Sequence, residues 1–186
     1  LRLSQGKADL SRRQVEYSLA GMSFREFLEL DGCGRFKAYN LEDILANHVS
    51  IAEFIVSKLK VIPKFEQYLK YGYYPFYKED SLHFHEKLLQ VVNQVLDADL
   101  PKVEDVTPET VRKARRMLTI LAESSPQTPN NSRLCQALEM DRKQGLKVLH
   151  ALRQAALVGM LVEDADALKR LCSPNKLFCD NTNLMH

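Results

Sequence analysis

The chain has 186 residues, a length that allows one domain or two small ones. Hydrophobic residues make up 45% and charged residues 27%, a globular composition that excludes disordered, collagen-like and mucin-like chains. With 26 Lys and Arg against 24 Asp and Glu, the formal net charge of +2 also excludes a histone-like polycation.

The sequence contains no targeting or membrane signal. No apolar run approaches the ~18 residues that a membrane-spanning helix needs, and no signal-peptide pattern opens the chain. The 4 cysteines form no Cys-x-x-Cys pair, which indicates reduced thiols and predicts a cytoplasmic protein. Because the first residue is Leu1, we expect a fragment or a processed form.

The first elements are short. Alternation of apolar and polar residues over Val15–Leu19 predicts a strand, and Ser23 with Glu26 forms a capping-box pattern that predicts a helix over Phe24–Leu30. From Asn40 onward the apolar residues recur with helical spacing, so we expect a long amphipathic helix broken at Pro63. A short helix over Lys64–Lys70 would follow and end at Gly72.

The next predicted elements are helices that begin at clear caps. Ser81 starts a helix that stops before Pro101, and Thr107-Pro108 starts a helix that Pro126 and Pro129 terminate. Ser132 is the expected N-cap of a helix over Arg133–Glu139.

The last part of the chain predicts a compact motif. Met140-Asp141 forms a tight turn before a helix over Arg142–Ala156, which has Leu146, Leu149 and Leu152 on its inner face. Two short strands follow, Val158–Val162 and Leu177–Asp180. Two helices across a tight turn and then a hairpin are typical of a winged helix, that is, a helix-turn-helix plus β-wing.

Arg12 and Arg13 are the first candidate catalytic residues. A planar guanidinium at the edge of a strand can enter a neighbouring subunit's site and neutralise charge on a transferred phosphoryl group. The alternative is that both are solvated surface arginines.

Several segments in order resemble one family. They are Leu3–Gly6, Ala8–Arg13, Tyr17–Leu19, Met22–Leu28, Tyr68–Phe76, Pro129–Leu134 and Lys176–Leu184. Together they resemble the prokaryotic AAA-type P-loop ATPases (the AAA+ superfamily) that carry a C-terminal winged helix. The chain departs from that pattern at Tyr73-Tyr74, where Gly-Tyr is commoner, and at Ala156, where the family usually has Gly.

The resemblance implies a mainly α fold in three parts. Residues 1–37 would be the tail of the nucleotide-binding domain with a short residual strand, residues 38–106 a helical lid-type bundle, and residues 107–186 the winged-helix domain. ATP and magnesium are implied for the parent protein, and Arg12 or Arg13 would act on the bound phosphate. The chain has no Gly-x-x-x-x-Gly-Lys-Ser/Thr motif, because its 7 glycines are scattered. We therefore expect no bound cofactor and no ATP hydrolysis by this chain alone.

The second candidate site is the outer face of the helix over Arg142–Ala156. Lys143, Lys147, His150 and Gln154 fall at helical spacing, with Arg142 and Arg153 beside them. Such a stripe can contact DNA phosphates or base edges. The alternatives are a solvated face or a surface that docks on a protein, and three acids near the hairpin tip (Glu163, Asp164 and Asp166) argue against DNA.

Other chemistry-bearing residues predict no separate site. His83 and His85 would point apart on a helix, so we predict surface histidines and no metal site. Cys172 and Cys179 could face each other across the hairpin or remain buried thiols. The aromatic cluster between Tyr68 and Tyr77 could stack bases or a peptide, or simply pack between helices.

Two functional hypotheses follow from the sequence. In the first, the chain is the lid and winged-helix part of an AAA-type ATPase whose P-loop domain lies upstream, with a homo-oligomer as a possible assembly and DNA or a protein as the partner. In the second, it is a stand-alone winged-helix module that binds DNA or docks on a protein without catalysis. Neither hypothesis includes membrane insertion.

Overall fold

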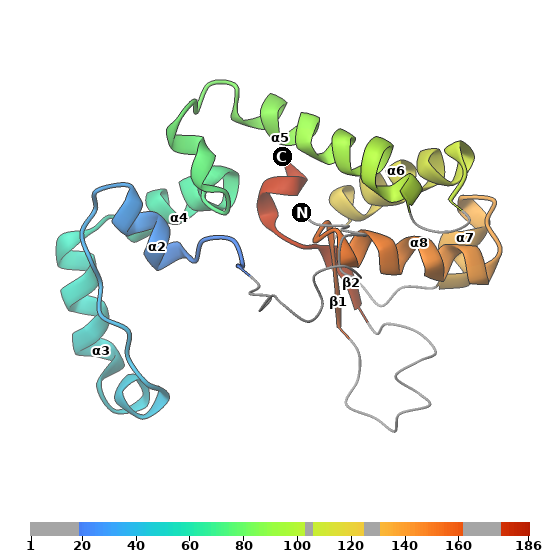
Figure 1. The fold of residues 1–186 in the computed structure, drawn as a ribbon. Coiled ribbons are helices and arrows are strands. Elements are labelled where there is room, and N and C mark those ends of the chain that lie inside the picture. Colours follow the sequence, from blue (N-terminus) through green and yellow to red (C-terminus); the bar gives the residue numbers. More distant parts are fainter. Residues whose placement is uncertain (1–18, 103–105, 125–130, 162–175) are drawn as a thin grey trace, which may run out of the picture. The chain divides into compact units, whose positions relative to one another are not determined.

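A computed structural model describes residues 19–102, 106–124, 131–161 and 176–186 (Figure 1). These residues are mainly helical, with one small antiparallel sheet of two strands. They fall into two compact units, one within Tyr17–Phe84 and the other within His85–Met185. The domain boundaries predicted after residues 37 and 106 stay predictions. Within the described ranges, no helix is long and apolar enough to cross a membrane.

The first unit begins with helix α2 over Phe24–Leu30, as predicted. The Ser23 hydroxyl accepts a hydrogen bond from the Glu26 amide, and the Glu26 carboxylate accepts one from the Ser23 amide, which confirms the capping box. Phe27 and Leu28 are the buried residues of this helix. The predicted strand over Val15–Leu19 lies almost wholly outside the described residues.

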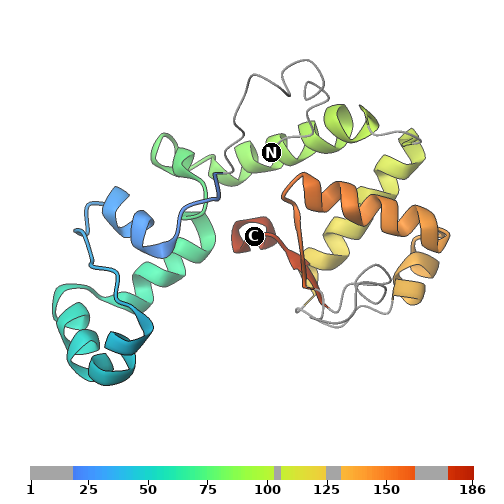
Figure 2. The ribbon, with the colours of Figure 1, turned by 60° about the horizontal axis from the view of Figure 1, so that its bottom comes forward.

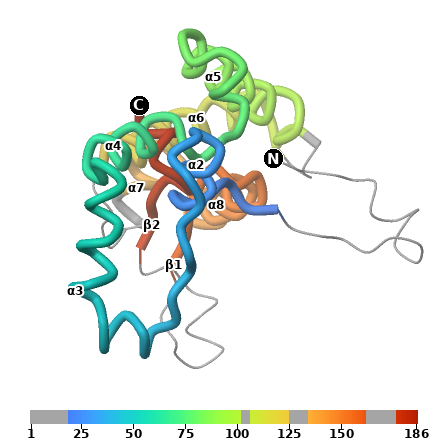
Figure 3. The backbone as a smooth tube through the Cα atoms, turned by 90° about the vertical axis from the view of Figure 1, so that its left-hand side faces the viewer, coloured from blue at the N-terminus to red at the C-terminus, as the bar shows by residue number. Residues whose placement is uncertain are grey.

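Helix α3 spans Leu41–Lys58 and is followed after two residues by helix α4, Val61–Tyr71. The break therefore falls at Leu59-Lys60, not at Pro63 as the sequence predicted. Pro63 fits inside the first turn of α4 because the first amides of a helix have no intrahelical acceptor. Figure 3 shows α3 and the extended segment that leads into it from α2.

Aromatic rings form the core of the first unit. Phe27 is fully buried. The centroid of its ring lies 5.6 Å from the ring centroid of Tyr68 and 5.3 Å from that of Tyr77. Tyr77 belongs to a short 3-10 turn, η1, over Pro75–Lys78. The Tyr68 hydroxyl donates to the Met22 carbonyl at 2.8 Å. The rings contact one another, which favours packing over base stacking as the role of this cluster.

The second unit opens with a long irregular helical stretch. Helix α5, Phe84–Gln94, continues into a π-helical turn η2, Val95–Asp99, and a 3-10 turn η3, Leu100–Lys102. Arg115, on the next helix, donates to both oxygens of Asp97 at 2.9 and 3.0 Å and to Asn93. This guanidinium therefore bridges α5 and the π-helical turn.

Helices α6 and α8 pack on the two strands, and α7 packs on α8 (Figure 2). Helix α6 spans Pro108–Glu123, with Thr107 as the predicted N-cap. Helix α7 spans Asn131–Ala137, so Ser132 lies inside it and is not its N-cap, contrary to the prediction. Helix α8 spans Arg142–Gln154, two residues shorter than predicted, and Asp141 caps its start.

Strand β1, Val158–Leu161, pairs antiparallel with strand β2, Lys176–Cys179, in a register that places Val158 opposite Cys179. The second strand thus starts and ends one residue before its predicted bounds. A last 3-10 turn, η4, covers Thr182–Met185. The segment that joins the strands lies outside the described residues.

The second unit has one continuous apolar core. Its fully buried residues come from η2 and η3, from α6 and α8, from the turn after α7, and from the start of β1 and the residue before it, and include Leu96, Leu100, Met117, Leu138, Leu149, Leu152, Leu157 and Val158. Gly145 lets α8 approach α7 closely, because a Cβ there would lie 2.3 Å from the sulfur of Cys135.

Helix α8 ends in a Schellman motif that places Ala156 in the left-handed region. The Leu157 amide bonds to the Leu152 carbonyl and the Ala156 amide to the Arg153 carbonyl, with Ala156 at a φ of 52°. A residue with a Cβ is strained in this conformation. Glycine would adopt this conformation without strain.

Ala156→Gly should therefore stabilise the protein. Relief of the left-handed strain exceeds the added entropy of the unfolded chain, so we expect the free energy of unfolding to rise by about 0.5–1 kcal/mol. Denaturant unfolding followed by circular dichroism measures the change. The matched control is Ala155→Gly, where φ is −77°; that variant should lose stability. If both variants were destabilised, the strain would not be present in solution.

Candidate functional site

The two predicted catalytic residues, Arg12 and Arg13, lie outside the described residues. The structure therefore gives no geometry for the predicted phosphate contact. Two other places carry organised charge: the outer face of α8 and a carboxylate at the end of α2.

The predicted stripe on α8 lies on one outer face. Lys143, Lys147, His150 and Gln154 lie at i, i+4, i+7 and i+11 along the helix. Lys147 is half-buried, and the other three side chains are exposed. Arg142 and Arg153 are exposed beside them. The opposite face buries Val148, Leu149 and Leu152. Leu146, which we predicted to face inward, is only half-buried.

Contacts from α6 fix the orientation of α8. The Asp141 carboxylate accepts from the Gln144 amide at 2.8 Å, and the Gln144 side chain reaches Thr110 on α6 at 3.3 Å. Lys113, also on α6, donates to the Glu139 carbonyl at the end of α7. The cationic face is thus presented on a rigid helix rather than on a loop.

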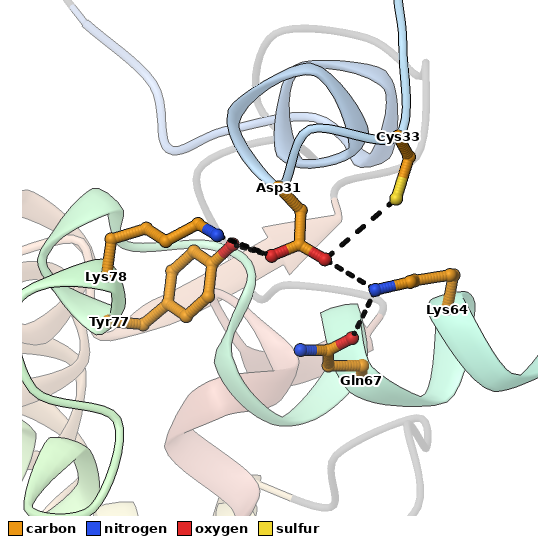
Figure 4. A network of polar contacts seen from close by, with 6 residues as sticks. All are labelled: Asp31, Cys33, Lys64, Gln67, Tyr77 and Lys78. Atoms are coloured by element: carbon orange, nitrogen blue, oxygen red, sulfur yellow. Dashed lines mark hydrogen bonds and ion pairs between the residues drawn. The ribbon is translucent and has the colours of Figure 1, made fainter.

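The carboxylate of Asp31 lies at the centre of a network of polar contacts (Figure 4). It accepts hydrogen bonds from the Lys64 ammonium at 2.5 Å, the Lys78 ammonium at 2.7 Å and the Tyr77 hydroxyl at 3.0 Å. The Cys33 thiol lies 3.9 Å from the same carboxylate. The network joins the end of α2 to α4 and to η1.

The position of Asp31 follows from local sequence, but its partners do not. Asp31 is the C-cap of α2, and Gly32 follows at a φ of 74°, a left-handed conformation that glycine adopts without strain. Its partners lie 33, 46 and 47 residues away. The sequence did not predict this site, because the Asp31-Gly32 pair indicates only the end of a helix.

The network shifts the pKa of Asp31, Lys64 and Tyr77 away from neutral pH. Burial alone would raise the pKa of Asp31, but the hydrogen bonds from Lys64, Lys78 and Tyr77 lower it to about 2. The Asp31 hydrogen bond raises the pKa of Lys64, and burial raises the pKa of Tyr77. The Asp31 carboxylate stays ionised and the Tyr77 phenol stays neutral, so the two do not act as an acid–base pair. We call Asp31 and its three donors, Lys64, Lys78 and Tyr77, the Asp31 brace, because they hold three segments together.

The described residues contain no group of three or more His, Cys, Asp or Glu side chains that could hold a metal ion. The His83 ring contacts the Asp80 carboxylate at 3.0 Å. Cys135 and Cys179 are buried free thiols, and burial raises the pKa of Cys179 to about 11. Cys172 lies outside the described residues, so its predicted relation to Cys179 is still a prediction.

Comparison with known proteins gives one family and one distant relative. A family model described as a domain of unknown function, DUF8612, matches residues 62–184. An uncharacterized protein of Methanocaldococcus jannaschii, MJ1637, is 24% identical over 154 residues, which cover 81% of this chain and 33% of that protein. The chain thus spans about a third of the length of that relative. No solved structure matches.

Neutralising the Asp31 carboxylate should lower stability at neutral pH, and this loss should disappear in acid. Asp31→Asn leaves two ammonium groups without their carboxylate, so we expect the free energy of unfolding at pH 7 to fall by about 1–3 kcal/mol. A carboxylate whose pKa is lowered from 3.8 to about 2 on folding adds stability above pH 3.8, and this contribution is lost as the pH falls through 2. The difference between wild type and variant should therefore shrink from pH 4 to pH 2.

Tyrosine fluorescence during urea unfolding checks this, because Tyr68 and Tyr77 lie in the same unit as Asp31. Glu79→Gln removes an exposed carboxylate close to η1 and is the matched control. A constant difference between wild type and Asp31→Asn across this pH range would contradict the brace.

Proposed function

The chain belongs to the DUF8612 family, a domain of unknown function, so its activity has to be inferred from its own residues, and we propose that it is the lid and winged-helix part of an AAA-type ATPase. The observation that carries the proposal is the order of segments along the chain. Arg12 and Arg13 in the sequence, the α2 segment, a helical region and a helix-turn-helix with two strands follow one another as in the family that the sequence resembles.

The arrangement of the second unit supports a winged helix. Helices α7 and α8 are joined by a tight turn at Glu139–Asp141, and β1 and β2 form an antiparallel pair after α8. Helix α6 packs on both α8 and β2, as the first of the three helices would. Three helices followed by a two-stranded hairpin are what this fold requires.

ATP and magnesium would be held elsewhere in the parent protein. The residues of this chain do not fit a nucleotide site by themselves, because no glycine-rich loop with a following lysine is present to cradle phosphates. In the proposal, this chain contributes Arg12 or Arg13 to the bound phosphate, and the P-loop domain of the parent protein is its main partner. The setting would be cytoplasmic.

The Asp31 brace supplies a path for coupling in this proposal. The α2 segment would follow the last strand of the nucleotide domain, and Asp31 at its end holds Lys64 of α4 and Lys78 of η1. A displacement of α2 on nucleotide binding would therefore pull on the helical region through two ion pairs and the Tyr77 hydrogen bond. The lid would then pass the nucleotide state to the winged helix.

A second candidate function is DNA binding by the winged helix. The observation that favours it is the exposed row of Arg142, Lys143, His150, Arg153 and Gln154 on one face of α8. A helix presented in this way can enter a major groove and contact phosphates and base edges. Docking of the same face on a protein is the alternative, with or without an attached ATPase.

Removal of the catalytic arginine should abolish ATP turnover by the full-length parent protein. An arginine that stabilises a transferred phosphoryl group contributes about 10³–10⁵-fold, so Arg12→Ala or Arg13→Ala should lower turnover by about 10³-fold or more. A steady-state phosphate-release assay measures it. Arg116→Ala, which removes an exposed arginine of α6, should leave turnover unchanged. Full activity in both variants would end the arginine role.

Binding of the chain to duplex DNA tests the second function. If α8 contacts phosphates, Lys143→Glu/Lys147→Glu should weaken affinity at least about tenfold and reduce the slope of log affinity against log salt by about 2. Fluorescence anisotropy with a labelled duplex measures both. Lys60→Glu/Lys70→Glu makes the same charge change on exposed lysines of the first unit. Equal affinity in the two double variants would exclude α8 as the DNA contact.

A further inference from the structure

The turn between α7 and α8 has a strained backbone. Glu139 lies just after α7 and has a φ of 53°, in the left-handed region where a Cβ is unfavourable. Its neighbours Leu138 and Met140 are buried, and the Met140 amide bonds to the Cys135 carbonyl. Helix α8 begins three residues after Glu139, so the conformation of this turn sets the direction in which α8 leaves it.

The ammonium of Lys113 holds this strained turn from α6. It donates to the Glu139 carbonyl at 2.6 Å, and the Lys113 side chain is only 12% exposed. A lysine on a helix normally keeps its ammonium in water, because desolvation of a charge is costly. Its other partner, the exposed Glu109 carboxylate at 3.0 Å, lies one turn away on the same helix. The bond to Glu139 is therefore the contact by which Lys113 acts on another element.

A second contact from the same face of α6 fixes the first turn of α8. The Gln144 side chain donates to the Thr110 hydroxyl at 3.3 Å, and Thr110 lies three residues before Lys113 on α6. Asp141, between the two contacts, caps α8 by accepting from the Gln144 amide. Helix α6 thus holds the chain on both sides of the α8 N-cap, which fixes both the direction of α8 and its rotation about its own axis.

The exposed face of α8 needs this support if it contacts DNA. A recognition helix reaches phosphates and base edges only when its side chains stand at a fixed angle to the groove. Groups that are held in place before binding lose less conformational entropy in the complex. Loss of a contact that orients α8 would therefore weaken DNA binding, although every contact to DNA is retained.

We propose that Lys113 is a positioning residue for DNA binding, because it holds the carbonyl of Glu139 in the strained turn and thereby sets the orientation of α8. The inference rests on the second candidate function, DNA binding by α8. In this arrangement Lys143 and Lys147 contact the DNA, and Lys113 does not.

Lys113→Met tests the role, because methionine keeps the apolar stem and removes the donor. Affinity of the whole chain for a labelled duplex should fall about three- to tenfold, the effect of one lost hydrogen bond. The slope of log affinity against log salt should not change, because no phosphate contact is lost. Lys113→Arg retains a donor and should bind within about twofold of wild type.

Relief of the strain at Glu139 gives a second test, which loss of packing at Lys113 would not pass. Glycine adopts the left-handed conformation without strain, so the turn would no longer need Lys113. In the Lys113→Met background, Glu139→Gly should bind the duplex at least about threefold more tightly than Glu139→Ala. Both changes remove the same carboxylate, so the difference reports the backbone alone. With Lys113 intact, the two changes should give equal affinity.

Amide hydrogen exchange of the free chain measures the turn without DNA. In Lys113→Met, the amides of Met140 and Gln144 should exchange faster than in wild type, by a larger factor than the amides of β1 and β2. Circular dichroism confirms that each variant remains folded.

The outcomes separate this inference from the function on which it rests. Absence of duplex binding by wild type would overturn DNA binding and with it the role of Lys113. If wild type binds, unchanged affinity in Lys113→Met or equal affinity of Glu139→Gly and Glu139→Ala in that background would overturn the positioning role alone. A salt slope reduced by about 1 in Lys113→Met would also overturn it, because Lys113 would then contact a phosphate itself. Equal acceleration of exchange in the turn and in the strands would do the same.

Discussion

The first unit depends on one half-buried carboxylate that is surrounded by cations. Asp31 accepts hydrogen bonds from two ammonium groups and a phenol, which come from α4 and η1. Three donors compensate for the desolvation of its charge, which is the condition under which a partly buried ion pair adds order rather than strain. The same contacts fix the end of α2 against α4 and η1, so the aromatic core around Phe27 is closed by electrostatics at its edge.

Three helices, found in both units, end in the same backbone motif with different residues at the left-handed position. Helices α2, α7 and α8 each end with paired hydrogen bonds of the Schellman type, and the left-handed residues are Gly32, Glu139 and Ala156. Glycine meets the requirement without strain, whereas the other two carry a Cβ. These strained residues flank α8, whose start and end set the position of the cationic face. The packing of the second unit therefore has to hold both turns in place.

Much of the fold could be predicted from local sequence patterns. The contacts between residues far apart in the sequence could not be predicted. Ser23 and Thr107 correctly predicted helix starts, because a cap acts within three residues of itself. The helix break predicted at Pro63 was wrong, because a proline in the first turn of a helix and a proline that ends a helix look alike in sequence. The α8 stripe was visible from its helical period. No local pattern marks Lys64 and Lys78 as partners of Asp31, because only the folded chain brings them to it.

Helices α3 and α4 are joined through a buried residue. Only Leu59 and Lys60 separate the helices, and Leu59 is buried and anchors the end of α3. Lys64, which holds Asp31, lies in the first turns of α4 just beyond this anchor. A restraint on α3 would therefore act on α4, and through Lys64 on the end of α2. If α2 moves with nucleotide, as we propose, a restraint on α3 and nucleotide binding would act on the same carboxylate from opposite sides.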